Sequence, residues 1–227
     1  MPRLSRRVFP GLPHHVVQRG NRREDVFFSD ADRLAYLDWL GEHCATGGVQ
    51  IVAYCLMTNH VHLVVVPGTE SALKEAFQPL HTRYAMRVNR TRGLMGRVWQ
   101  GRFFSAVLDQ TYFYAAVRYV ELNPVRASMV GKASDFPWSS APAHCGLEQD
   151  PLLVAPHSWL PDLNGSAAWA EWLAQGDRPD HVTALRQNTR REIPCGSEAF
   201  ICELERRVGR PLRPRARGRP AKASSNN

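Results

Sequence analysis

The first part of the chain alternates between short β-type patterns and longer helical patterns of apolar residues. The β-branched segment 13–19 is followed by the turn-prone residues Gly20 and Asn21, which is typical of a strand. Segment 29–48 has leucines at helical spacing between a serine and two glycines, so it predicts a helix. Residues 49–57 alternate and are rich in β-branched side chains, which predicts a second strand.

A hairpin, a second helix and a further strand follow. Two polar residues, Thr58 and Asn59, separate the second strand from the apolar run 60–66, so these segments predict a β-hairpin. Helical spacing returns over 69–90, a strand pattern covers 102–108, and a last helical pattern covers 109–122. The order β-α-β-β-α-β predicts an α+β fold of the ferredoxin-like split β-α-β type, an antiparallel sheet with helices packed on it. The run 60–66 would be a central strand of that sheet.

The composition changes near residue 142, where we place the end of a first domain, residues 1–142. The segment 143–200 predicts a helical or irregular extension, and the sequence assigns no role to most of it. Residues 201–227 are basic and interrupted by prolines, so we expect a disordered tail there.

Positive charge is concentrated at both ends of the chain, which has 227 residues and a formal net charge of +8. Residues 1–23 hold six arginines and no acidic residue, and residues 200–227 hold eight Lys or Arg against two Glu. Such ends suggest a polyanion as partner, because each phosphate that is neutralised releases counterions. Charge that only keeps the ends in solution is the alternative.

The cysteines and the N-terminal residues indicate a compartment. Five cysteines without C-x-x-C spacing argue against a disulfide framework and against a zinc ribbon, which favours a reducing environment. The arginine-rich start lacks the apolar core of a secretory signal, and no apolar run approaches the length of a membrane span. We therefore expect a cytoplasmic protein.

Four polar residues in two segments are candidates for chemistry. His60 and His62 lie two residues apart in a predicted strand, so their side chains share one face and can bind one divalent ion. Two structural, hydrogen-bonded histidines would produce the same pattern. Tyr119 and Asn123 lie four residues apart, so they share a helix face, and a tyrosine hydroxyl beside a metal suits attack on a phosphodiester. Alternatively, Tyr119 belongs to an aromatic core stripe with Tyr112, and Asn123 caps a new helix.

Four stretches in chain order resemble a known family. They are "HVVQRGNRREDVFF", "AYCLMTNHVHLVVVP", "WQGRFFSAVLDQTYFYAAVRYVELNPVRA" and "DFPWSSAPAH". Together, across residues 8–142, they resemble the REP-associated tyrosine transposases, a branch of the bacterial HUH single-tyrosine transposases. The later stretch "GSEAFICELERRVGRPL" is similar to the C-terminal extension of that branch.

This resemblance implies a ferredoxin-like HUH domain in which His60 and His62 bind Mg²⁺ or Mn²⁺ and Tyr119 is the nucleophile. Asn123 stands where a third polar ligand is expected, although glutamine or histidine is commoner there in related enzymes. The implied substrate is single-stranded DNA beside a small palindromic hairpin, cleaved to leave a 5′-phosphotyrosine and a free 3′-hydroxyl. The resemblance also implies a nucleoid-associated protein that acts as a monomer, with a dimer as the alternative.

Basic and aromatic residues outside these motifs are candidates for DNA contacts. Residues 19–23 surround the turn after the first strand, and 83–102 hold six arginines and no acid, with aromatic residues that can stack on unpaired bases. Residues 213–220 resemble an AT-hook, whose arginines enter a narrow minor groove. The alternatives are a solvated helix face, core aromatic residues and a basic tail without a defined binding mode. The candidates are Arg19, Asn21, Arg22, Arg23, Arg83, Arg87, Trp99, Arg102, Arg215, Arg217 and Arg219.

Two other functions would use the same fold. A DNA-binding regulator that no longer cleaves is one, and the intact His60, His62 and Tyr119 argue against it. A metal-dependent phosphoesterase that does not use Tyr119 is the other, and it predicts hydrolysis without a covalent adduct.

Overall fold

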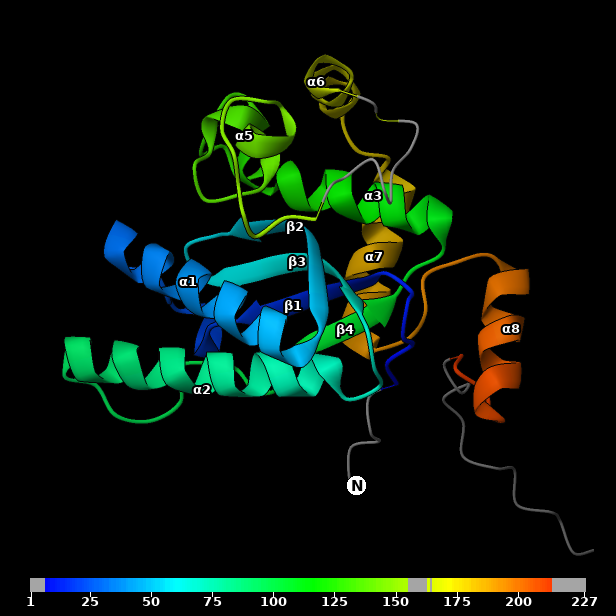
Figure 1. Ribbon diagram of the computed structural model, residues 1–227, viewed down its shortest axis with the longest axis horizontal. Coiled ribbons are helices and arrows are strands. Elements are labelled where there is room, and N and C mark those ends of the chain that lie inside the picture. The colour runs from blue at the N-terminus through cyan, green and yellow to red at the C-terminus, as the bar shows by residue number, and fades with distance from the viewer. Residues whose placement is uncertain (1–6, 155–162, 164, 214–227) are drawn as a thin grey trace, which may run out of the picture.

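A four-stranded antiparallel sheet lies at the centre of the protein (Figure 1), in a computed structural model that describes residues 7–154, 163 and 165–213. The strand order is β2-β3-β1-β4, so β3 and β1 are the central strands. The predicted α+β fold, with 60–66 in a central strand, is confirmed. The strands are β1 (His14–Arg19), β2 (Val49–Leu56), β3 (His60–Pro67) and β4 (Phe104–Val107).

Helices cover both faces of the sheet (Figure 1). Helices α1 and α2 pack side by side on one face, and α3 lies across the other face with α7 beside it. The helices are α1 (Asp30–Gly47), α2 (Ala72–Arg92), α3 (Gln110–Glu121), α4 (Asn123–Arg126), α5 (Ala141–His144), α6 (Ser166–Ala174), α7 (Pro179–Arg191) and α8 (Glu198–Val208), with 3₁₀ turns η1 (Asn21–Arg23) and η2 (Ala133–Asp135).

The helix ends follow local sequence signals. The Ser29 hydroxyl accepts a hydrogen bond from the backbone N–H of Asp32, and α1 ends where Gly48 takes the left-handed φ of 65°. Helix α3 begins after Asp109, whose carboxylate accepts from the backbone N–H of Tyr112. This cap fixes where α3 starts and therefore which of its residues face the sheet.

The two faces of β3 enter different cores. Val61, Leu63 and Val65 have no exposed surface and pack in the cluster formed with α1 and α2. Val64 and Val66 belong to the second cluster, which is built around α3. Side chains of a strand alternate between its faces, so His60 and His62 lie on the α3 side.

The chain beyond residue 142 packs on the same core as α3. Trp169 of α6, Leu185 of α7 and Cys195 are buried in the cluster that contains Phe113 of α3. The domain boundary near residue 142 stays a prediction, and this packing brings α7 next to α3 and β4.

A buried carboxylate joins this later part of the chain to α3. Glu121 has no exposed surface and accepts hydrogen bonds from Ser140 Oγ at 2.6 Å and Trp169 Nε1 at 2.8 Å. His144 Nδ1 lies 2.5 Å from the same carboxylate. Buried charge is costly unless it is fully hydrogen-bonded, so these contacts hold the end of α3 in one position.

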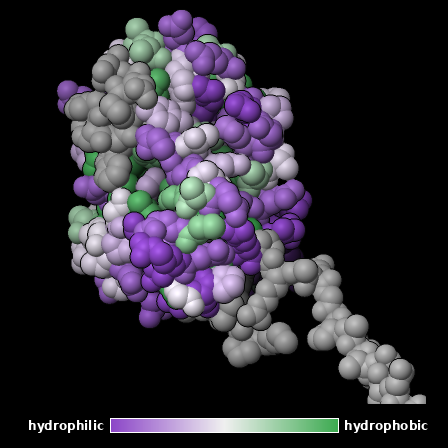
Figure 2. Space-filling view, turned by 90° about the vertical axis from the view of Figure 1, so that its right-hand side faces the viewer, coloured by the Kyte–Doolittle hydropathy of each residue, from purple (hydrophilic) through white to green (hydrophobic). Residues whose placement is uncertain are grey.

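Residues 201–208, which the sequence analysis assigns to a disordered tail, are helical. Ser197 caps α8 by accepting from the N–H of Phe200, and Leu204, 1% exposed, packs with Phe9 and Val107. The helical pattern is weak in the sequence because charged residues surround a single apolar stripe. The side of the molecule that faces right in Figure 1 has a largely hydrophilic surface (Figure 2). No helix among the described residues is both long and apolar enough to cross a membrane.

Candidate catalytic site

Three histidines and a tyrosine meet in a cavity on the α3 side of the sheet. His60 and His62 come from β3, His15 from β1 and Tyr119 from α3, and all four line this cavity of about 790 Å³. The ring centroids of His60 and His62 are 4.8 Å apart, and those of His62 and Tyr119 are 5.3 Å apart. The structure therefore brings the predicted histidine pair and the predicted nucleophile together, and adds His15, which β1 places beside β3.

Hydrogen bonds on Nδ1 orient both histidines of the pair. His60 Nδ1 lies 2.7 Å from Asn59 Oδ1, an acceptor, so Nδ1 carries the proton and Nε2 keeps a lone pair. His62 Nδ1 lies 3.0 Å from His15 Nε2, and His15 Nδ1 lies 2.8 Å from Thr189 Oγ1. All of these groups are paired when His62 Nδ1–H donates to His15 Nε2 and His15 Nδ1–H donates to Thr189 Oγ1. This arrangement leaves His62 Nε2 with a free lone pair.

The donor set fits a divalent metal ion. His62 Nε2 is buried and has no hydrogen-bond partner among the described residues, which is costly for an N–H but suits a metal ligand. Burial lowers the pKa of His60 to about 3, with Arg19 and Arg186 adding to the effect, and burial lowers the pKa of His62 well below its usual value. Both imidazoles are therefore neutral at pH 7, and neutral imidazole is the form that binds metals.

Asn123, the expected third ligand, lies in the same cavity. Its side chain is 7% exposed and has an Nδ2 atom without a hydrogen-bond partner among the described residues. Within residues 7–154, 163 and 165–213, no cluster of three or more His, Cys, Asp or Glu side chains is arranged to hold a metal. The Asn123 amide oxygen is of the type that binds hard divalent cations.

Two arginines hold Tyr119, which is 3% exposed. The Arg126 guanidinium lies 4.2 Å from the ring centroid and donates to the Tyr119 carbonyl oxygen at 2.6 Å, and it also pairs with Asp177. Arg186 Nε of α7 donates to the phenol oxygen at 3.2 Å. The residue expected to be the nucleophile is thus fixed through its ring, its backbone and its reacting oxygen.

The cavity is strongly basic. Five arginines line it, and no acidic side chain is among its described lining residues, so the cavity suits an anion such as a phosphodiester. Arg19 and Arg23 were expected from the sequence to contact DNA. The other three are Arg126, Arg186 and Arg190.

Other predicted DNA contacts lie elsewhere. Asn21 and Arg22 form the turn η1, next to the cavity residues Arg19 and Arg23. Arg215, Arg217 and Arg219 lie outside the described residues.

Arg83 and Arg87 point to α1 on the opposite side of the sheet. Arg83 Nη1 lies 2.8 Å from Glu42, and Arg87 Nε lies 3.3 Å from Asp32, so carboxylates of α1 already neutralise both guanidinium groups. Two arginines of the basic run are therefore part of the contact between α1 and α2.

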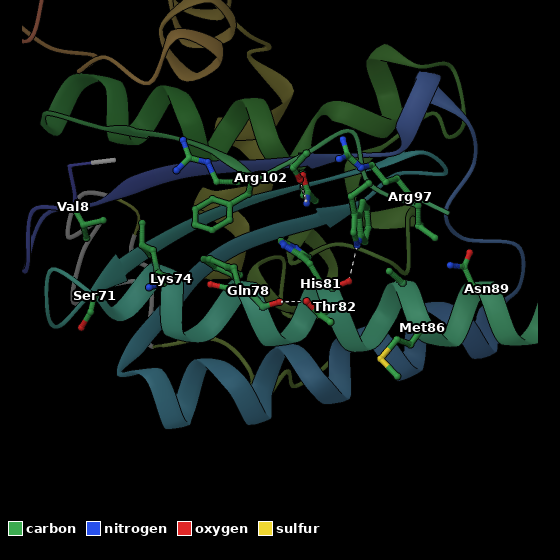
Figure 3. A pocket seen from close by; sticks show the side chains of 18 of the residues that line it. Val8, Ser71, Lys74, Gln78, His81, Thr82, Met86, Asn89, Arg97 and Arg102 are labelled. Atoms are coloured by element: carbon green, nitrogen blue, oxygen red, sulfur yellow. Dashed lines mark hydrogen bonds between the residues drawn. The ribbon is translucent and has the colours of Figure 1, made fainter. Parts of the chain in front are cut away.

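Trp99 and Arg102 also lie on the α2 side. Trp99 is 7% exposed, and its indole N–H donates to the His81 carbonyl at 2.9 Å, so it is a core residue with little surface left for stacking on a base. Arg102 lines a separate groove of about 860 Å³ along α2, together with Lys74 and Arg97 (Figure 3).

Sequence reasoning missed the part of the site that comes from His15, Arg126 and α7. Arg186 and Thr189 are about seventy residues away from Tyr119, and no local pattern connects them to it. His15 carried a usable signal, because a histidine in the first strand of a split β-α-β unit can face the central strand beside it.

Comparisons with known proteins identify the family of this chain. Residues 9–123, just over half of the chain, match the family described as "Transposase IS200 like". No curated protein matches the chain.

Two solved structures are similar. A REP-associated tyrosine transposase bound to a REP hairpin superposes with a TM-score of 0.51 at 19% identity, over 68% of this chain and 92% of that one. A putative transposase from Deinococcus radiodurans R1 has a TM-score of 0.36 at 18% identity, over 57% of this chain and 92% of that one. The first shares the fold, and the matched segment contains His60, His62, Tyr119 and Asn123. The protein is therefore a member of the IS200-like transposase family.

Proposed function

We propose that this protein is a metal-dependent tyrosine transposase of the REP-associated branch, which nicks and rejoins single-stranded DNA beside palindromic hairpins. The observation that carries the proposal is the position of the Tyr119 ring, 5.3 Å from that of His62, whose buried Nε2 has no partner among the described residues. The hairpin in the similar solved structure supports the choice of substrate.

In this mechanism His60, His62 and Asn123 would hold the metal ion, and Tyr119 provides the nucleophile. Mg²⁺ or Mn²⁺ held by His60, His62 and the Asn123 amide would neutralise phosphate charge and orient the phosphorus for in-line attack. The Tyr119 oxygen forms a bond to phosphorus as the bond from phosphorus to the 3′-oxygen breaks. The phenol loses its proton to solvent and the 3′-oxygen gains one, so the products are a 5′-phosphotyrosine and a 3′-hydroxyl.

The surrounding arginines support each part of this step. Arg126 fixes the ring and backbone of Tyr119, and Arg19 and Arg23 provide positive charge on the side of β1. The phosphotyrosine bond retains the energy of the phosphodiester, so a second 3′-hydroxyl can reverse the reaction and join a new strand. His60, His62 and Tyr119 line one cavity within a single chain, so a monomer contains the whole proposed site.

The test is a denaturing gel of the protein with single-stranded DNA that carries a palindromic hairpin from beside its own gene. We expect a covalent DNA–protein adduct in Mg²⁺ or Mn²⁺, none in EDTA, and none with Tyr119→Phe. Cleavage that survives Tyr119→Phe without an adduct would instead identify a phosphoesterase. Tight binding without cleavage would identify a regulator.

A further inference from the structure

Helix α7 places a guanidinium on the atom that is expected to react. Arg186 Nε donates to the Tyr119 phenol oxygen at 3.2 Å, and its guanidinium carbon lies 5.5 Å from the ring centroid. Arg126, in contrast, holds Tyr119 through the ring face and the backbone carbonyl. The two arginines therefore have different contacts with the same tyrosine.

Buried residues on α7 hold Arg186 in this position. Leu185, immediately before it, has no exposed surface and packs in the α3 core. Thr189, one turn later, is 2% exposed and is hydrogen-bonded to His15 at 2.8 Å. An arginine between two such anchors has its backbone fixed relative to the site, which is what precise positioning of a guanidinium requires.

The charge of Arg186 is available to a phosphate. Arg126 is paired with Asp177, whereas Arg186 forms no salt bridge with a carboxylate in the described part of the chain. Arginine presents five N–H donors in a planar fork, so one guanidinium can contact the phenol oxygen and a phosphate oxygen together. It also lines the cavity that contains His60 and His62.

We propose that Arg186 is a catalytic residue, which aims the phenol oxygen of Tyr119 at the scissile phosphate and stabilises the charge on the phosphate oxygens during transfer. The proposal rests on the proposed function, because the step is the same: the bond from the Tyr119 oxygen to phosphorus forms, the bond to the 3′-oxygen breaks, and the proton balance is unchanged. Arg186 lies outside residues 9–123, the segment that matches the family, so the assignment comes from this structure.

The experiment compares single-turnover adduct formation and DNA affinity in wild type, Arg186→Ala, Arg186→Lys and Arg191→Gln. Arg191 is the matched control, an exposed arginine on the same helix that does not line the cavity. At saturating hairpin DNA in Mn²⁺, we expect Arg186→Ala to slow adduct formation about 10²-fold, the loss typical of one removed donor in an active site. The DNA affinity of Arg186→Ala should change by less than about fivefold. Arg186→Lys should recover part of the rate of adduct formation. Arg191→Gln should equal wild type in both rate and affinity. Thermal unfolding of each variant identifies any that is misfolded.

A second measurement needs neither DNA nor metal. The chain has six tyrosines, and selective ¹³Cζ labelling gives one NMR signal for each, with Tyr119→Phe identifying the signal of interest. If Arg186 donates to the phenol oxygen, Arg186→Ala moves this signal and Arg191→Gln does not.

The outcomes separate the two proposals. Wild-type rates in Arg186→Ala at saturating DNA, with only weaker binding, would overturn the catalytic role and leave Arg186 as a phosphate contact. An unmoved ¹³Cζ signal would overturn the positioning of the phenol oxygen. Absence of an adduct in wild type with every hairpin supplied would overturn the proposed function itself, and the catalytic role of Arg186 with it.

Discussion

The two faces of one sheet have different compositions and different tasks. On the α1–α2 face, Val61, Leu63 and Val65 of β3 are fully buried in an apolar cluster. On the α3–α7 face, the alternate positions of the same strand include His60 and His62, which line a basic cavity. One strand therefore contributes both to a core and to a site. The two are separated because successive side chains of a strand point to opposite faces of the sheet.

The same contrast holds for the arginines on the two sides. Arg83 and Arg87 of α2 are paired with carboxylates of α1, whereas Arg19 and Arg186 line a cavity without a described acidic residue. A basic run in the sequence is thus a poor guide to a binding site. The useful distinction is whether a carboxylate already neutralises each guanidinium group.

The largest expected effect is on the α3 face. His62→Ala removes a buried imidazole that we expect to bind the metal, so Mn²⁺ affinity and adduct formation should each fall by more than about 10²-fold. Electron paramagnetic resonance of free Mn²⁺ measures the binding without DNA. His43→Gln, a histidine of α1 on the other face, is the control and should bind Mn²⁺ as wild type does. Equal Mn²⁺ binding in His62→Ala would contradict the assignment of this site.

The neighbouring residue on the other face should affect stability instead. Leu63→Ala opens a cavity in a core position with no exposed surface, so the free energy of unfolding should fall by about 2–5 kcal/mol. Urea unfolding of wild type and Leu63→Ala measures this loss of free energy. Adduct formation per folded molecule should stay within about threefold of wild type, and a selective loss of chemistry would show that the two faces are coupled.

Buried histidines should also make the protein sensitive to acid. Burial lowers the pKa of His15 to about 3, against 6.5 for an ordinary histidine. Between these two pKa values the unfolded state binds more protons than the folded state. The contribution of His15 to folding stability is therefore present above pH 6.5 and is lost as the pH falls from 6.5 towards 3. The His15 contribution to that fall should be about 2 kcal/mol from pH 6.5 to pH 4.5. Urea unfolding in EDTA should show a correspondingly flatter pH dependence in His15→Gln, and an unchanged slope would argue against a buried neutral His15.

A smaller effect tests the link between α7 and the metal site. Thr189→Val removes the partner of His15 Nδ1 and so disturbs the group that orients His62. Loss of such a supporting contact typically weakens metal binding at least tenfold, and we expect about that loss in a Mn²⁺ titration. Thr183→Val is the matched control, because that hydroxyl is exposed on the same helix and donates to the Pro179 carbonyl at 2.8 Å. A similar loss in both variants would point to damage to α7 as a whole.

The smallest effect concerns the paired arginines. Arg83→Ala removes an exposed ion pair with Glu42, which should cost less than about 1 kcal/mol of stability. Its DNA affinity should remain within about threefold of wild type, whereas Arg19→Ala should weaken binding and reduce the salt dependence measured by fluorescence anisotropy. A stronger loss in Arg83→Ala than in Arg19→Ala would move the DNA path to the α2 side.

The sequence by itself determined the order of the elements and part of the site. Alternation and helical spacing located β1 to β4 and α1 to α3 to within a few residues, because these patterns record which side of each element is buried. The spacing of His60 and His62 set their common face, whereas Tyr119 lies in the last turn of α3 and Asn123 begins the separate short helix α4, in line with the alternative that Asn123 starts a new helix.

Only the tertiary structure decided which distant residues complete that site. Arg186 and Thr189 reach it because α7 packs against α3 and β4, and Trp99 becomes a core residue because α2 covers it. Local periodicity shows that a residue is buried or exposed but not which partner covers it, since that depends on how whole elements pack. The proposed nucleophile, Tyr119, could therefore be named from the sequence, whereas the guanidinium that contacts its oxygen could be found only in the fold.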